Sequence, residues 1–72
     1  MKIQFVLVKD IYDFNHLAIN TAGEAHLLQD RYRVDAKSIL GLFTLDLTRN
    51  IELELEDTTA YPYFKQFEAP NV

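Results

Sequence analysis

The chain has 72 residues, a formal net charge of −4 and an apolar share of 49%. This length predicts one domain, residues 1–72, with a thin core, because a chain of this size buries only about 60% of its unfolded surface. The negative charge argues against a nucleic-acid partner, which would need a basic stripe. The absence of cysteine excludes a disulfide framework and thiolate metal sites.

No apolar run approaches the roughly 18 to 20 residues that a membrane-spanning helix needs. Met1 leads directly into a predicted strand rather than into a signal peptide. We therefore expect a cytoplasmic protein without membrane contact.

The first predicted strand is marked by Ile3, Phe5 and Leu7, which alternate with other residues and would face a core. A helix is predicted over Ile11 to Ala22, where apolar residues recur at helical spacing. Asp10 precedes it and is suited to cap its first turn. The sequence thus opens with a strand followed by one amphipathic helix.

A hairpin is predicted next, with strands at Glu24 to Gln29 and Arg31 to Asp35 and a turn near Gln29 and Asp30. The turn lacks an Asn-Gly signal, so its type stays open. The side chains expected to face the core are Ala25, Leu27, Tyr32 and Val34.

The clearest period-two pattern in the chain runs from Ile51 to Glu56, where apolar residues alternate with three glutamates. It predicts a strand with one face in water. Carboxylates two apart could suggest a metal or acid/base row, but this spacing is typical of a solvated strand face. The neighbouring cations expected to offset their repulsion are Lys2, His26 and Arg33.

The last segment is predicted to form a short aromatic helix on the sheet. Thr59 is a candidate cap, Pro62 falls near the first turn and Pro70 stops the helix. The aromatic residues expected on one side are Tyr63, Phe64 and Phe67.

Together these elements predict an α+β fold of order β-α-β-β-α-β-α, with a four-stranded antiparallel sheet covered by helices on one face. The final helix would be short. This is an open-faced sandwich in a single domain.

The stretch from Val34 to Leu47 is the centre of this arrangement, because a polar strand end leads there into a short apolar helix. Ser38 is placed to cap that helix, since its hydroxyl can accept a hydrogen bond from a free backbone N–H. Ile39, Leu40, Leu42 and Phe43 cover too much of one turn for all to be buried. Some should remain exposed as a protein-docking surface.

The same stretch resembles the second half of HPr, the small phosphocarrier of the bacterial sugar phosphotransferase system. In that family a strand ends in an Ala/Leu-Lys-Ser-Ile/Leu-Met-Gly segment whose serine starts the short second helix. Here the segment from Ala36 to Gly41 matches it, and the resemblance extends from Glu24 to Leu55. The resemblance implies the HPr-like fold, a four-stranded sheet with three helices on one side.

The family carries phosphate on a histidine at the start of its first helix, in a Gly-Leu-His-x-Arg-Pro-Ala setting. This chain lacks that motif: aligned back from Gly23, the histidine falls at Leu7, the arginine at Lys9 and the proline at Asp10. An aspartate in that place would repel phosphate. Carriage on histidine is therefore expected to be lost, as in the catabolite-repression HPr-like proteins.

The family's second functional position is kept. The serine matching Ser38 is phosphorylated in some members by an HPr kinase/phosphorylase, and the phosphorylated protein docks on a transcriptional regulator. The resemblance therefore implies that Ser38 is a phosphorylation site and that Lys37, Ile39, Leu40 and Phe43 bind a protein. A phosphoserine there would add charge where a helix N-terminus tolerates it.

Two alternatives stay open. One is a phosphocarrier that uses His16 or His26, although each histidine is better explained as a structural or solvated residue. The other is a plain interaction domain without phosphorylation. The chain shows no nucleophile-base pair, phosphate-binding glycine loop or metal-ligand spacing, so we expect no enzyme, metal or cofactor. Its exposed aromatic surface leaves self-association open.

Overall fold

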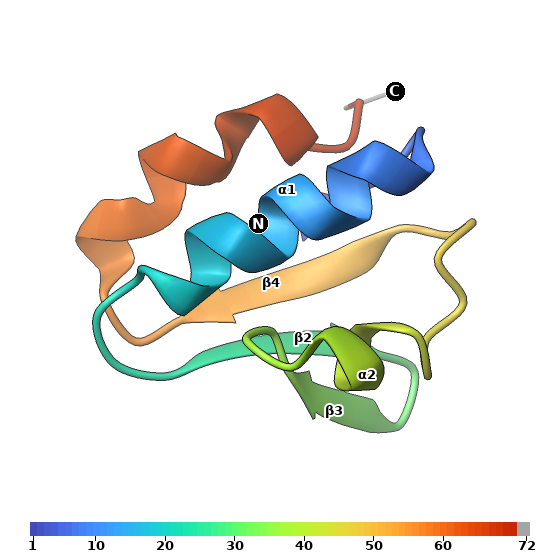
Figure 1. The fold of residues 1–72 in the computed structure, drawn as a ribbon, viewed down its shortest axis with the longest axis horizontal. Helices are drawn as coiled ribbons and strands as arrows, with labels where there is room; N and C mark the ends of the chain where they lie inside the picture. Colours follow the sequence, from blue (N-terminus) through green and yellow to red (C-terminus); the bar gives the residue numbers. More distant parts are fainter. Residues whose placement is uncertain (71–72) are drawn as a thin grey trace.

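The computed structural model describes residues 1–70 and folds them into an α+β domain with one sheet (Figure 1). The order of its elements along the chain is the predicted one, with a 3₁₀ helix, η1, as the last. The elements are β1 (Lys2–Ile3), α1 (Val8–Ile19), β2 (Ala25–Gln29), β3 (Tyr32–Asp35), α2 (Ile39–Leu42), β4 (Ile51–Leu55) and η1 (Thr58–Phe67).

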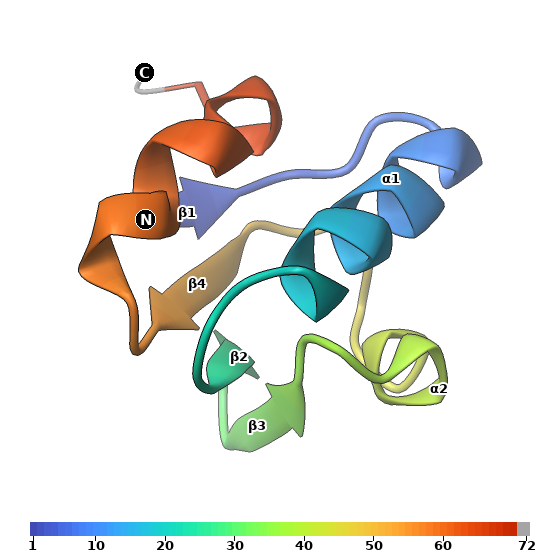
Figure 2. The same ribbon diagram turned by 60° about the vertical axis from the view of Figure 1, so that its left-hand side comes forward.

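The four strands form one antiparallel sheet in the order β1-β4-β2-β3. Ile51, Leu53 and Leu55 of β4 are buried, and they share one core cluster with side chains from α1, α2 and η1. The helices therefore pack against the buried face of β4, and Figure 2 shows α1 and α2 on one side of the sheet with η1 beside β1. Within residues 1–70, none of them is long and apolar enough to cross a membrane.

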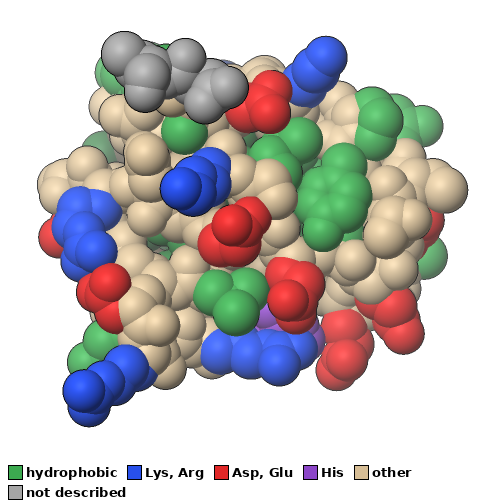
Figure 3. Space-filling view, turned by 180° about the vertical axis from the view of Figure 1, so that it is seen from behind, with side chains coloured by type: hydrophobic (Ala, Val, Ile, Leu, Met, Phe, Trp, Pro, Cys, Tyr) green, Lys and Arg blue, Asp and Glu red, His purple; other side chains and the backbone are tan. Residues whose placement is uncertain are grey.

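The opposite face of the sheet carries charged side chains, which lie among apolar ones in Figure 3. The glutamates of β4 lie there, as their spacing predicted, and Arg33 of β3 pairs with Glu54 at 3.2 Å. Lys2 lies opposite Glu52 in the strand register, but the amine that contacts Glu52, at 2.6 Å, is that of Met1. The expected compensation of charge is present at Arg33, and at Glu52 the N-terminal amine takes the place predicted for Lys2. The contact found for His26 is with Arg33, at 3.4 Å, and not with a glutamate.

The first strand is shorter than predicted, and Leu7 does not face the core. Ile3 and Phe5 are buried as expected, whereas Leu7 is 62% exposed. The reason lies in the partner strand: Ile3 lies opposite Ile51, the first residue of β4, so the residues after Ile3 have no partner in β4. The chain then turns directly into α1.

Helix α1 begins at Val8 and ends at Ile19, three residues earlier at each end than predicted. Asp10 therefore lies inside the first turn and is not the N-cap residue. Its carboxylate reaches back to accept the backbone N–H groups of Leu7 (2.9 Å) and Val6 (3.0 Å). This is one half of a capping box, in which the side chain at the third helical position accepts the N–H of the N-cap residue.

The hairpin of β2 and β3 closes through Asp30 and Arg31, as its pairing of Gln29 with Tyr32 requires. Asp30 has a φ of 55°, a left-handed conformation that aspartate tolerates better than most residues. Ala25 and Leu27 are buried as predicted and Val34 is half-buried. The prediction for Tyr32 was wrong, because this residue lies at the sheet's rim and is exposed.

Two predictions about the last helix were also wrong. Asp57 is its cap, because the Asp57 carboxylate accepts the backbone N–H of Thr59 at 3.1 Å. Tyr63 faces away from the core. The observed 3₁₀ conformation has three residues per turn, so Tyr61, Phe64 and Phe67 fall on one side. Phe64 and Phe67 are buried against α1, where both rings contact Phe14.

Candidate protein-docking site

The candidate site lies where β3 ends and α2 begins. Ser38 caps α2 as predicted: its hydroxyl accepts the backbone N–H of Gly41 at 3.1 Å. The Ser38 backbone has extended dihedrals, and its own N–H donates to the carbonyl of Asp35 at 3.0 Å. The serine is half-buried, and its contact with Gly41 holds the hydroxyl at the start of the helix.

The apolar residues of α2 divide between core and surface, as the sequence predicted. Leu42 is fully buried, and Ile39 is half-buried against the core. Leu40 is 78% exposed and Phe43 is 48% exposed. A helix of one turn can bury only one side, so the other two side chains remain available to a partner.

Lys37 is less available than the docking residues beside it. Its ammonium donates to the backbone carbonyl of Thr21 at 2.8 Å, and the side chain is half-buried. The lysine thereby ties the start of α2 to the loop that follows α1. Of the four predicted binding residues, Leu40 and Phe43 lie open at the surface, and Lys37 and Ile39 support the helix.

A residue that the sequence reasoning missed completes the surface. Tyr12 of α1 is 54% exposed, and its ring lies 6.2 Å from the ring of Phe43. Val8 precedes Tyr12 by one helical turn and is also exposed. The spacing of four between these two apolar residues, which lie beside the buried stripe of the helix, was the signal. We call Val8, Tyr12, Leu40 and Phe43 the α1–α2 apolar surface.

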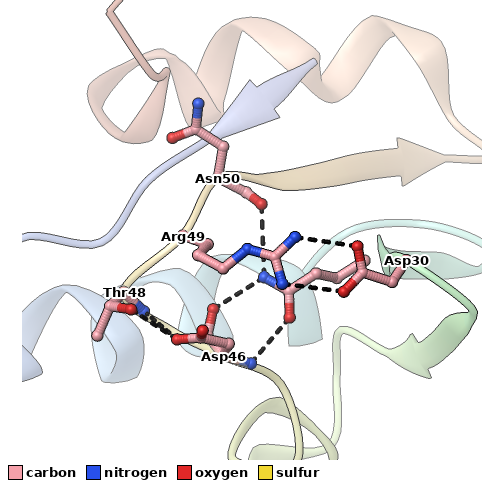
Figure 4. Close-up of polar contacts among 6 residues, drawn as sticks. Asp30, Asp46, Thr48, Arg49 and Asn50 are labelled. Atoms are coloured by element: carbon pink, nitrogen blue, oxygen red, sulfur yellow. Dashed lines mark hydrogen bonds and ion pairs between the residues drawn. The ribbon is translucent and has the colours of Figure 1, made fainter.

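A polar cluster anchors the loop that connects α2 to β4 (Figure 4). Gln29 is buried, and its amide both donates to the carbonyl and accepts the N–H of Asp46, each at 2.8 Å. Arg49 forms a bidentate ion pair with Asp30, in which each of the two N–O distances is 2.9 Å. The loop that follows α2 is thus held to the β2–β3 hairpin.

Hydrogen bonds within this cluster lower the pKa of two carboxyl groups, those of Asp30 and Asp46. The Arg49 guanidinium stabilises the charged form of Asp30 and lowers its pKa. The hydroxyl and N–H of Thr48 do the same for Asp46. These charges are exposed, so the cluster acts mainly by fixing the path of the chain.

The start of α1 carries a carboxylate of its own. Asp10 accepts the N–H groups of Leu7 and Val6, which lower the pKa of that carboxyl. His16 lies exposed in the last turn of the same helix, and His26 lies half-buried on β2. Neither histidine stands at a helix start, and within residues 1–70 no three His, Asp or Glu residues gather as a metal site.

Comparison of the chain with protein-family models, with curated proteins and with solved structures finds no match.

Proposed function

We propose that this chain is an HPr-like regulatory module that does not carry phosphate on histidine and that binds a protein through the α1–α2 apolar surface. Support comes from the Ala-Lys-Ser-Ile-Leu-Gly segment at the start of α2 and from the order of the elements. The histidine motif of the HPr family is absent from the sequence.

One observation carries the proposal: the exposed apolar side chains directly follow a capping serine. Leu40 and Phe43 stand on the turn that Ser38 begins, and Tyr12 extends the surface onto α1. Apolar side chains gathered on one small surface are typical of a protein-binding site. A charge added at Ser38 would lie at the rim of this surface and alter its affinity for partners.

The modification we propose is phosphorylation of Ser38. An HPr kinase would transfer the γ-phosphoryl group of ATP to the Ser38 oxygen, with loss of the hydroxyl proton and release of ADP. The added charge of about −1.5 to −2 lies at a helix start, where backbone N–H groups such as that of Gly41 stabilise it. The fold would be kept while the docking surface gains charge.

The docking role is tested by affinity capture of a transcriptional regulator or other protein on the immobilised chain. Phe43→Asp and Leu40→Asp each put a charge in the α1–α2 apolar surface. Tyr63→Asp is the matched control, because Tyr63 is 72% exposed and lies on η1.

We expect a partner that the wild type and the Tyr63 variant retain and the two surface variants lose, with circular dichroism confirming that all four chains are folded. Equal retention by all four would contradict the proposed surface.

A second candidate is a plain interaction domain in which Ser38 is never phosphorylated. The observation in its favour is that the Ser38 hydroxyl is half-buried and already used as a cap. It predicts the same loss of partner with Phe43→Asp but no phosphoserine after incubation with the kinase. The Ser38 modification therefore separates the two functions.

A further inference from the structure

In the described part of the chain, one edge of the sheet is hydrogen-bonded to another segment, and the other edge is open. At the β1 edge, the segment after η1 adds a partial strand: Gln4 donates to Phe67 at 2.8 Å, and Ala69 donates to Lys2 at 2.9 Å. The carbonyl of Lys2 and the N–H of Gln4 on this edge are thereby used. Figure 2 shows β3 at the other rim of the sheet, on the side away from β1 and η1.

The outward backbone groups of β3 belong to Arg33 and Asp35. The residue pair that closes a two-residue hairpin is hydrogen-bonded, so Tyr32 and Val34 turn their N–H and C=O groups toward β2. Ala36 continues this alternation with a bond to β2 of 2.9 Å. Among residues 1–70, no backbone hydrogen bond from another segment reaches the N–H of Arg33 or Asp35.

We propose that a second copy of this chain pairs with β3 along this edge, antiparallel and with the twofold axis at Val34. In that register Arg33 of each copy lies opposite Asp35 of the other. Each such pair exchanges both backbone hydrogen bonds. The two four-stranded sheets then form one continuous sheet across the dimer.

Charge complementarity selects this partner and this register. Opposite charges across an antiparallel pair are favourable, and like charges directly opposite are unfavourable. An axis at position 33 would set Arg33 against Arg33, and an axis at position 35 would set Asp35 against Asp35. Only the axis at Val34 pairs unlike charges at both positions.

The groups needed for these contacts remain available. One oxygen of Asp35 accepts the N–H of Lys37 at 2.8 Å, which leaves the second oxygen for a partner. One nitrogen of Arg33 contacts Glu54 at 3.2 Å, and a guanidinium has further donors. The carbonyl of Asp35 accepts the N–H of Ser38 and has a second lone pair.

On the helix-covered side of β3, the Val34 side chains of the two copies would face each other. Tyr32 would add apolar contact beside them, since it is exposed in the single chain. This edge lies on β3, whereas the α1–α2 apolar surface lies on the helices. The proposal therefore stands apart from the proposed function, and either can fail alone.

The test measures dimerisation by sedimentation equilibrium over micromolar to millimolar chain concentrations, with amide hydrogen exchange followed by NMR at the same concentrations. We expect a weak dimer, because the edge is short. The exchange of the Arg33 and Asp35 amides should slow as concentration rises. The Val34 amide, already bonded within the chain, is the internal reference.

Charge variants identify the register. Arg33→Asp should weaken the dimer by on the order of ten-fold, because it places two pairs of like charges opposite each other. Adding Asp35→Arg to the same chain should restore dimerisation. Glu54→Gln removes the partner of Arg33 within the chain and should leave the dimer intact.

A chain that stays monomeric at all concentrations would overturn the proposal. So would a dimer that leaves the Arg33 and Asp35 amides unprotected, or one whose affinity does not respond to the charge exchange. In the last two cases the dimer would form through another face of the molecule.

Discussion

The capping contact of Ser38 gives a first prediction at the scale of a single residue. Ser38→Ala removes the acceptor for the Gly41 N–H and should lower the free energy of unfolding by about 1 kcal/mol. Ser38→Asp is the matched control, because aspartate caps a helix about as well as serine. Urea unfolding measures both. Equal stability of the alanine variant and the wild type would show that the contact does not hold α2.

Asp10 gives a prediction about pH. The N–H groups of Leu7 and Val6 lower the pKa of its carboxyl in the folded chain. Ionised Asp10 therefore stabilises the fold above the unfolded pKa of about 3.9, and this contribution is lost as the pH falls through the lower folded value. The stability gap between wild type and Asp10→Asn should be largest near neutral pH and shrink in acid. Urea unfolding across pH checks this, and a gap independent of pH would contradict it.

At the scale of elements, η1 shows why part of the fold was predictable and part was not. The aromatic residues of the tail indicated a helix packed on the sheet, which is present. The expected side chain positions assumed helical spacing of 3.6, whereas the observed spacing is three, so Tyr63 falls outside the buried row. The buried row packs against Phe14 of α1, a contact that local sequence does not reveal.

Two substitutions test this packing. Phe64→Ala empties a fully buried site and should lower the free energy of unfolding by about 3 to 5 kcal/mol. Tyr63→Ala, one residue earlier and exposed, should change it by less than about 0.5 kcal/mol. Thermal or urea unfolding of the pair gives the comparison. Similar losses for both variants would contradict the arrangement of η1.

The loop between α2 and β4 depends on Gln29. Gln29→Leu keeps the size of the side chain but removes both hydrogen bonds to the backbone of Asp46, and it should cost about 1 to 3 kcal/mol of unfolding free energy. Gln66→Leu, at an exposed glutamine, is the control. A loss no larger than that of the control would mean that the loop is held by Arg49 and Asp30 alone.

This cluster could not be foreseen from the sequence, because its members come from β2, the hairpin turn and the loop after α2. The same reason hid Tyr12, which meets Phe43 only when α1 and α2 come together. The cap at Ser38 and the exposure of Leu40 and Phe43 were predicted correctly because a cap and an apolar turn are local patterns. Local features of the candidate site were thus predictable, and contacts between elements were not.

For the whole molecule, the order of the elements and the solvent-exposed face of glutamates were predicted from periodicity. A period of two places alternate side chains of a strand on a buried face and on a solvent-exposed face. The ends of β1 and α1 did not, because they depend on where β4 and the segment after η1 stop pairing with the N-terminal strand. The proposed function combines this fold with a serine that is kept and a histidine motif that is absent.

The central claim is that the chain is modified on Ser38 and carries no phosphate on histidine. Intact-mass analysis after two incubations, one with HPr kinase and ATP and one with enzyme I and phosphoenolpyruvate, tests it most directly. We predict one added phosphate with the kinase, absent from Ser38→Ala, and none with enzyme I. A phosphate gained from enzyme I, or none from the kinase, would contradict the claim.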